Sequence, residues 1–171
     1  MQEPMLRLNG VNENLKIRVE TTLQGPDSPG KVAKALHALF PEFAIPHPII
    51  EPELGSANDQ HWACDQVPLD HFIQQLHRQQ ILDTALDYMS THYADGSTMF
   101  TLSRQAALAG KVAFPLPTEV PLGGVITVHL EGETLADWLE AATWHRGRDS
   151  VPKSIHDDRT MSGDGEAVTW I

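Results

Sequence analysis

Two short runs of the sequence carry side chains that bind phosphate groups and the edges of nucleobases. The first holds Arg78 and Gln79, and the second holds Arg104, Gln105 and Lys111. A planar arginine fork matches the geometry of a phosphate, and a glutamine amide both donates and accepts hydrogen bonds. These residue types therefore predict a small polar surface that positions an RNA backbone.

Each run also has a structural interpretation, which the residues alone leave open. Arg78 is close enough along the chain to pair with Asp83 or Asp87. The second run begins at Ser103, a residue able to cap a short helix whose first amides would attract an anion. The same run is equally able to fix the packing of a strand against that helix, in which case Arg104 has no ligand.

Lys31 and Lys34 are the other candidate phosphate contacts. They lie three residues apart on a predicted helix, so they share one face of it. As RNA contacts they would extend a basic strip from the first two runs. As structural residues they form the solvated side of an amphipathic helix. We carry both interpretations forward.

Metal binding and catalysis have little support in the sequence. The chain has nine histidines and one cysteine, but His61 and Cys64 lack a second ligand pair. His71 and His77 are six residues apart, a poor spacing for shared ligation on a helix. No nucleophile elbow, phosphate-binding glycine loop or His-Glu-x-x-His motif occurs. We therefore expect no metal ion, no cofactor and no enzymatic activity.

The candidate residues must be positioned by strands and helices that the hydrophobic pattern predicts. Period-two alternation predicts strands, and apolar positions spaced by three and four predict helices. The expected strands cover 15–21, 98–102 and 125–130, with short extended pieces at 49–50, 61–64 and 112–114. The expected helices cover 29–40, 104–109 and 133–144, and 68–92 is either one kinked helix or two. This order predicts an α+β fold, a mostly antiparallel sheet with helices packed on one face.

The charge of the chain restricts the possible partners. Its 23 acidic residues against 12 lysines and arginines give a net charge of -11, which excludes a protein that coats nucleic acid non-specifically. Between 71 and 114, however, three cationic residues balance three aspartates. Any RNA contact is thus confined to one patch. A domain over 1–132 and a C-terminal helix with a partly mobile acidic tail over 133–171 are expected.

The lone cysteine and the hydropathy pattern bear on location. Cys64 fits a reducing compartment, because one cysteine builds no internal disulfide. No apolar run approaches the roughly 20 residues of a membrane span, and the N-terminal residues lack the apolar core of a secretory signal. We expect a cytoplasmic protein without a membrane partner.

Three runs of residues, in order and spacing, resemble a known family. They are 78–85, 100–114 and 121–128, and the similarity extends over about 14–132. The chain resembles an archaeal family of small predicted RNA-binding proteins associated with the exosome. The resemblance implies a fold similar to that of large-subunit ribosomal protein five. Where the family usually has Asn-Lys, this chain has Ser103 and Arg104.

Together these observations predict a non-enzymatic RNA-contacting accessory module, active in RNA processing or ribosome-related work. A protein of an RNA-processing complex is the partner that the resemblance implies. The alternative is a protein-interaction adaptor or dimerisation module that makes no RNA contact and whose acidic face meets a basic partner. Oligomeric state is not encoded in any motif that we identify.

Overall fold

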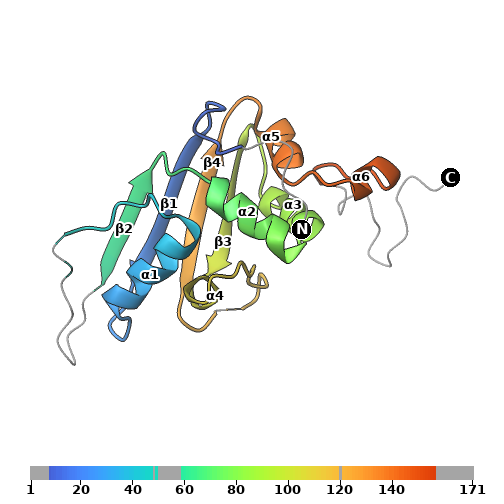
Figure 1. The fold of residues 1–171 in the computed structure, drawn as a ribbon. Helices are drawn as coiled ribbons and strands as arrows, with labels where there is room; N and C mark the ends of the chain where they lie inside the picture. The colour runs from blue at the N-terminus through green and yellow to red at the C-terminus, as the bar shows by residue number, and fades with distance from the viewer. Residues whose placement is uncertain (1–7, 48, 50–58, 120, 157–171) are drawn as a thin grey trace.

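The computed structural model describes residues 8–47, 49, 59–119 and 121–156 of the 171-residue chain. Within them, four strands form one antiparallel sheet in the order β2-β1-β4-β3. The strands are β1 (Lys16–Leu23), β2 (Gln60–Asp65), β3 (Ser97–Ser103) and β4 (Val125–Glu131). The helices are α1 (Pro29–Leu39), α2 (Asp70–Gln79), α3 (Leu82–Ser90), α4 (Arg104–Leu108), α5 (Leu135–Ala142) and α6 (Gly147–Ser150). Figure 1 shows α1 and α2 on the same face of the sheet, which confirms the predicted α+β architecture.

The two faces of the sheet follow from period-two alternation in the strands. In β1 the side chains of Ile17 and Val19 are buried, whereas those of Lys16 and Arg18 are exposed. Successive strand residues point to opposite faces, so one face contacts the helices and the other meets solvent. The alternation predicted this strand correctly, and the strand runs two residues beyond the predicted end at Thr21.

A row of three phenylalanines joins the helices to the sheet. The ring of Phe72 in α2 lies 5.7 Å from the ring of Phe40, just after α1, and 6.0 Å from that of Phe100 in β3. All three rings are buried in the same core. Stacked aromatic pairs at these distances stabilise a core beyond the area that they bury. Phe72 therefore fixes α2 over the centre of the sheet.

The sequence left open whether 68–92 forms one kinked helix or two, and the structure contains two. Gln80 follows α2 with a φ of 56°, in the left-handed region that ends many helices. The amide of Ile81 donates to the carbonyl oxygen of Leu76 at 3.3 Å, which closes that end before α3 begins. The end of α2 thus places Arg78 and Gln79 at a helix terminus.

The segment between α1 and α2 contains one strand of the sheet. The piece expected at 61–64 is β2, which pairs with β1 at one edge of the sheet. Ile49 belongs to no strand, and Ile50 lies outside the described residues. The extended piece expected at 112–114 forms no strand either, although the amide of Ser103 donates to the carbonyl oxygen of Ala113 at 2.9 Å.

Helix α5 belongs to the same core as the sheet. Its residues Leu135, Trp138 and Leu139 are buried within the one hydrophobic cluster. The indole Nε1–H of Trp138 donates to the carboxylate of Glu13 at 2.8 Å, which ties α5 to the segment before β1. The division expected after residue 132 therefore does not separate two cores.

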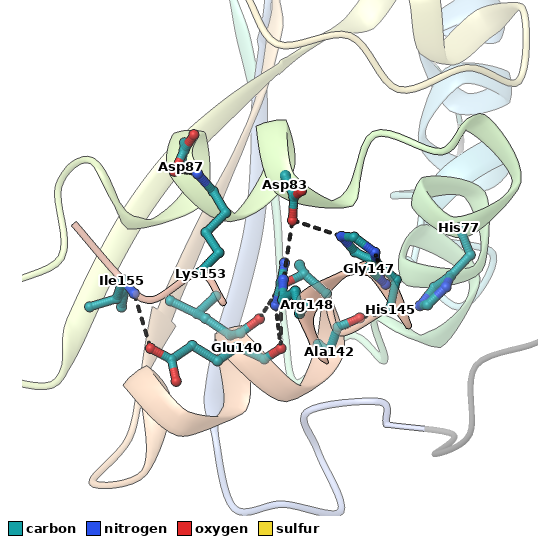
Figure 2. Close-up of polar contacts among 12 residues, drawn as sticks. His77, Asp83, Asp87, Glu140, Ala142, His145, Gly147, Arg148, Lys153 and Ile155 are labelled. Atoms are coloured by element: carbon teal, nitrogen blue, oxygen red, sulfur yellow. Dashed lines mark hydrogen bonds and ion pairs between the residues drawn. The ribbon is translucent and has the colours of Figure 1, made fainter. Parts of the chain in front are cut away.

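The chain after α5 is fastened to α3 (Figure 2). Lys153 pairs with the carboxylate of Asp87 at 2.9 Å, and the His156 ring donates to the carbonyl oxygen of Ser90 at 2.7 Å. These polar contacts join the first part of the segment after α5, up to His156, to the body of the fold. Residues 157–171 lie outside the described part of the chain. Across the described residues, no helix has the length and apolar content needed to cross a membrane.

Candidate nucleic-acid interface

Arg104, the strongest sequence candidate for phosphate binding, is a buried structural residue. Its side chain is only 4% exposed. The guanidinium donates to the carbonyl oxygens of Gly123 at 2.6 Å and Thr22 at 3.0 Å, and to the Thr21 hydroxyl at 2.9 Å. Its Nη2 pairs with the Asp27 carboxylate at 2.7 Å. The prediction that Arg104 presents its charge to RNA is corrected, because each of the three guanidinium nitrogens donates a hydrogen bond within the protein.

Arg104 fills the gap where two central strands diverge. The pairing of β1 with β4 ends at Glu20 and Thr127, and the guanidinium joins the backbone on both sides beyond that point. A signal for this was present in the sequence. Phe100 and Leu102 are the inward positions of β3, and Arg104 continues the same alternation. Strand parity therefore places it inward, whereas residue type alone suggests the surface.

Gln79 is also structural. Its amide oxygen accepts the Val112 N–H at 2.7 Å, and its amide nitrogen donates to the Val112 carbonyl oxygen at 2.9 Å. The side-chain amide of Gln75 donates to the amide oxygen of Gln79 at 2.9 Å. Gln79 lies seven residues after Phe72, on the buried stripe of α2, and this spacing was the missed signal. Its role is to fasten the end of α2 to the chain after α4.

The remaining five candidates are exposed, on neighbouring elements of the helical side. Lys31 and Gln105 line one hollow of about 310 Å³ between α1 and α4. Arg78 and Lys111 are the chain neighbours of Gln79 and Val112, whose paired hydrogen bonds bring those two segments together. Lys34 extends the exposed side of α1. We name these residues the helical-side patch: Lys31, Lys34, Arg78, Gln105 and Lys111.

Ser103 caps α4 as expected, but the start of this helix is not an anion site. The Ser103 hydroxyl accepts the Ala106 N–H at 3.2 Å. The Arg104 N–H donates to the carbonyl oxygen of Gly124 at 3.2 Å. With these amides engaged inside the protein, the motif fixes strand, helix and loop against one another. This is the structural interpretation that the sequence had left open.

The two acids that were candidates to pair with Arg78 are engaged elsewhere. Figure 2 shows the Asp83 carboxylate facing His145 and Arg148, at 2.9 and 3.1 Å. Burial acts to raise the pKa of Asp83, but the hydrogen bonds from these two side chains outweigh it and lower the pKa overall. Asp87 pairs with Lys153. The C-terminal segment thus neutralises both aspartates and leaves Arg78 without them.

The distribution of ion pairs separates the helical-side patch from the other cations. The described residues include ten lysines and arginines, and four of them, Arg18, Arg104, Arg148 and Lys153, pair with carboxylates. Of the six without such a pair in the described chain, four are in the patch, and the others are Lys16 and Arg146. Unpaired, solvated cations are the ones available to a phosphate.

On the open face of the sheet, by contrast, the charge of Arg18 is already neutralised. Arg18 contacts Glu20 and Asp65, each at 3.1 Å, and Glu20 accepts from the His129 ring at 3.1 Å. Burial acts to raise the pKa of Glu20, yet the hydrogen bonds from His129 and Arg18 lower it overall. Among the residues described by the structure, no three histidine, cysteine or acidic side chains are arranged to hold a metal ion.

His77 makes folding depend on pH. Burial is the main reason that its pKa lies below the ordinary 6.5, and the charge of His145 adds to the shift, although a 3.3 Å contact with the Ala142 carbonyl oxygen opposes it. Protons therefore bind the unfolded chain more readily than the folded one. The free energy of unfolding is expected to be greatest above pH 6.5 and to fall as the pH drops through the folded-state pKa.

Urea unfolding at a series of pH values between 7.5 and 5.5 tests this expectation. His77→Gln retains an amide donor for Ala142 but does not titrate, so its stability should vary less with pH than that of the wild type. His47→Gln, at an exposed position, is the matched control and should keep the wild-type slope. An unchanged slope in His77→Gln would show that another group causes the dependence.

Comparisons with known proteins give one consistent group of relatives. No protein-family model matches the chain. The chain is 28% identical over 145 residues to a UPF0201 protein of Methanothermobacter thermautotrophicus, an alignment that covers 83% of this chain and 98% of the relative. It is 31% identical over 103 residues to a UPF0201 protein of Methanopyrus kandleri, covering 54% and 65%. The crystal structure of a UPF0201 protein from Methanococcus jannaschii matches with a TM-score of 0.60 at 22% identity, covering 74% of this chain and 95% of that one.

Proposed function

We propose that this chain, which is similar in sequence and fold to archaeal UPF0201 proteins, is a non-enzymatic module that contacts RNA through its helical-side patch. The observation that carries the proposal is that four exposed cations on the helical side have no ion pair within the described residues: Lys31, Lys34, Arg78 and Lys111. The setting that we propose is the cytoplasm, in RNA processing or ribosome-related work beside a protein partner. The likeness to ribosomal protein five stays a prediction.

The mechanism is the positioning of phosphates. Lysines act as point charges, and the Arg78 fork is able to hold two phosphate oxygens at once. Gln105, exposed beside Lys31, supplies an amide for a sugar or base edge. The large aromatic rings of the core, such as those of Phe72 and Trp138, are buried and offer no platform for stacking bases. Selectivity then comes from the shape of the RNA.

The acidity of the rest of the chain restricts the surface that RNA can approach. With a net charge of -11, surfaces outside the patch repel a polyanion. The open sheet face contributes little attraction, because Arg18 is shared between two carboxylates. RNA is thus expected to approach only the helical side, with modest affinity and a single orientation.

Fluorescence anisotropy with labelled RNA tests the proposal, using a mixed-sequence single strand and a stem-loop at several salt concentrations. If four cations contact phosphates, the logarithm of the binding constant should fall with the logarithm of salt with a slope of about -3 for the single strand. Arg78→Gln combined with Lys111→Gln should weaken binding about tenfold and make the slope shallower by roughly 1.5.

The matched control changes net charge by the same amount at a different place. Lys16→Gln combined with Arg146→Gln removes the other two unpaired cations of the described chain, both exposed. This control should retain RNA affinity to within about a factor of two or three, as expected for screened, distant charges. Equal weakening by both double variants would leave only a net-charge effect and refute the patch. Absence of any salt-sensitive RNA binding by the wild type would refute the function.

A further inference from the structure

A groove of about 1040 Å³ lies on the other side of α4, between α3, the outer face of the sheet and the loop from Phe114 to Gly124. Much of its lining is apolar and comes from that proline-rich loop and from β3. The Tyr88 hydroxyl donates to the Pro115 carbonyl oxygen at 2.7 Å and lies 3.3 Å from the Thr101 hydroxyl. The walls of the groove are therefore held together by specific contacts.

The free edge of β3 opens into this groove. The amide of Ser97 donates to Ala94 and that of Ser103 to Ala113, both away from β4. Because alternate residues of a strand direct their backbone groups to the same side, Met99 and Thr101 also point theirs away from β4. Within the described residues these N–H and C=O groups have no hydrogen-bond partner. Both residues line the groove.

The loop that borders this edge exposes apolar side chains. Leu122 is 83% exposed and Leu116 is 61% exposed. Both line the groove together with Met99, which is itself partly exposed. Exposed leucines in one groove, beside unpaired strand groups, are typical of a surface that binds another chain.

The charges that line the groove favour one kind of partner. Arg104 is one of the residues that line the groove, but its guanidinium is already paired with Asp27. Glu119, in contrast, is an exposed carboxylate of the loop without an ion pair in the described chain. The groove thus has an available negative charge and no available lysine or arginine. RNA is disfavoured there, and a basic side chain is favoured.

We propose that this groove binds an extended apolar segment of a partner protein that carries a lysine or arginine, and that the segment adds a strand beside β3. Main-chain hydrogen bonds to Met99 and Thr101 supply affinity, and alternate side chains enter the apolar lining. The bonds of Ser97 and Ser103 close the two ends of the edge, so the added strand is short. The groove contains none of the five patch residues, although Leu122 also lines the hollow that holds Lys31 and Gln105, so the protein would have two neighbouring binding surfaces.

A random peptide library displayed on phage, selected against the full chain, provides the probe. Selected peptides are expected to alternate apolar residues and to include a lysine or arginine. Their synthetic forms should bind Leu116→Ser combined with Leu122→Ser at least tenfold more weakly than the wild type. Glu119→Gln should weaken them several-fold. In the complex, hydrogen exchange should slow at the amides of Met99 and Thr101.

Two controls replace similar residues outside the groove: Leu108→Ser, at a position that is 42% exposed, and the exposed Glu42→Gln. Both should keep peptide affinity, and the double leucine variant should keep RNA affinity and thermal stability. Failure to select any peptide, or equal binding by the double leucine variant, would overturn the proposal. So would unchanged exchange at both amides, a wild-type dimer that this variant abolishes, or RNA that competes with the peptide. Of these results, only competition by RNA would also bear on the helical-side patch.

Discussion

Replacing Arg104 by methionine is expected to lower the free energy of unfolding by about 3–5 kcal/mol, the range for breaking a buried ion pair from one side. The guanidinium satisfies two carbonyl oxygens, the Thr21 hydroxyl and the Asp27 carboxylate, and methionine replaces none of these bonds. Among the described residues, Asp27 would then keep the Gln24 amide as its one remaining partner, at 2.8 Å. The loss combines missing hydrogen bonds with an uncompensated charge.

A double-mutant cycle measures the contribution of the uncompensated Asp27 charge. Arg104→Met combined with Asp27→Asn removes both charges, so it should be more stable than the sum of the two single losses predicts. Arg104→Lys keeps the charge but loses the fork, and we expect it to lie between wild type and methionine. Urea unfolding followed by circular dichroism gives all four values. A loss below about 1 kcal/mol for Arg104→Met would contradict a structural role.

A substitution at Gly124, whose backbone lies against the Arg104 guanidinium, provides a second test of this site. A side-chain carbon added at Gly124 would lie 2.7 Å from the guanidinium, and the φ of this glycine is +78°. Gly124→Ala therefore combines a close contact with a left-handed backbone, and it should also destabilise the fold. For this reason an RNA-binding defect in an Arg104 variant is interpretable only when its folded fraction is measured alongside.

Leu139→Ala is expected to cost about 2–5 kcal/mol of unfolding free energy, as full truncations of buried leucines do. Leu139 lies in the middle of α5, has no solvent exposure and belongs to the core cluster that includes the sheet. If 133–171 were an appendage to a complete domain, its truncation would leave the main unfolding transition unchanged. The structure leads us to expect a single transition at lower urea concentration.

An exposed residue of the same helix supplies the control for this prediction. Ala141 is on the exposed side of the same helix, and Ala141→Ser should change stability by no more than about 0.5 kcal/mol. Thermal unfolding followed by both far-UV signal and tryptophan fluorescence should give coincident curves. Two separated transitions in the wild type would instead support an independent unit after residue 132.

Much of the architecture was predictable because it depends on local rules. Alternation along 15–21 and 98–102 predicted strands, since a half-buried sheet exposes every second residue. Ser28 and Ser103 accept amides at the starts of α1 and α4, because a side-chain oxygen at that position satisfies a free N–H. In the sequence, the break at Gln80 shows only as an interruption in the helical spacing of apolar residues. Its left-handed backbone conformation is seen only in the structure.

The candidate site was predictable in part. Residue type identified Lys31, Lys34, Arg78 and Lys111 as cations able to meet phosphate, and all four are exposed. Residue type also selected Arg104 and Gln79, which are internal. An arginine fork binds carbonyl oxygens and carboxylates of its own chain with the same chemistry that binds phosphate. Only its surroundings decide which of the two it meets.

The sequence by itself determined the fold class, the short balanced stretch within an acidic chain, and the cations available for a ligand. These properties follow from composition and from spacing between near neighbours. The tertiary structure decided which charges are already neutralised: Asp27 reaches Arg104 across 77 residues, and Arg148 reaches Asp83 across 65. Such pairs join residues far apart in the chain through the packing of whole elements, and no local pattern encodes them.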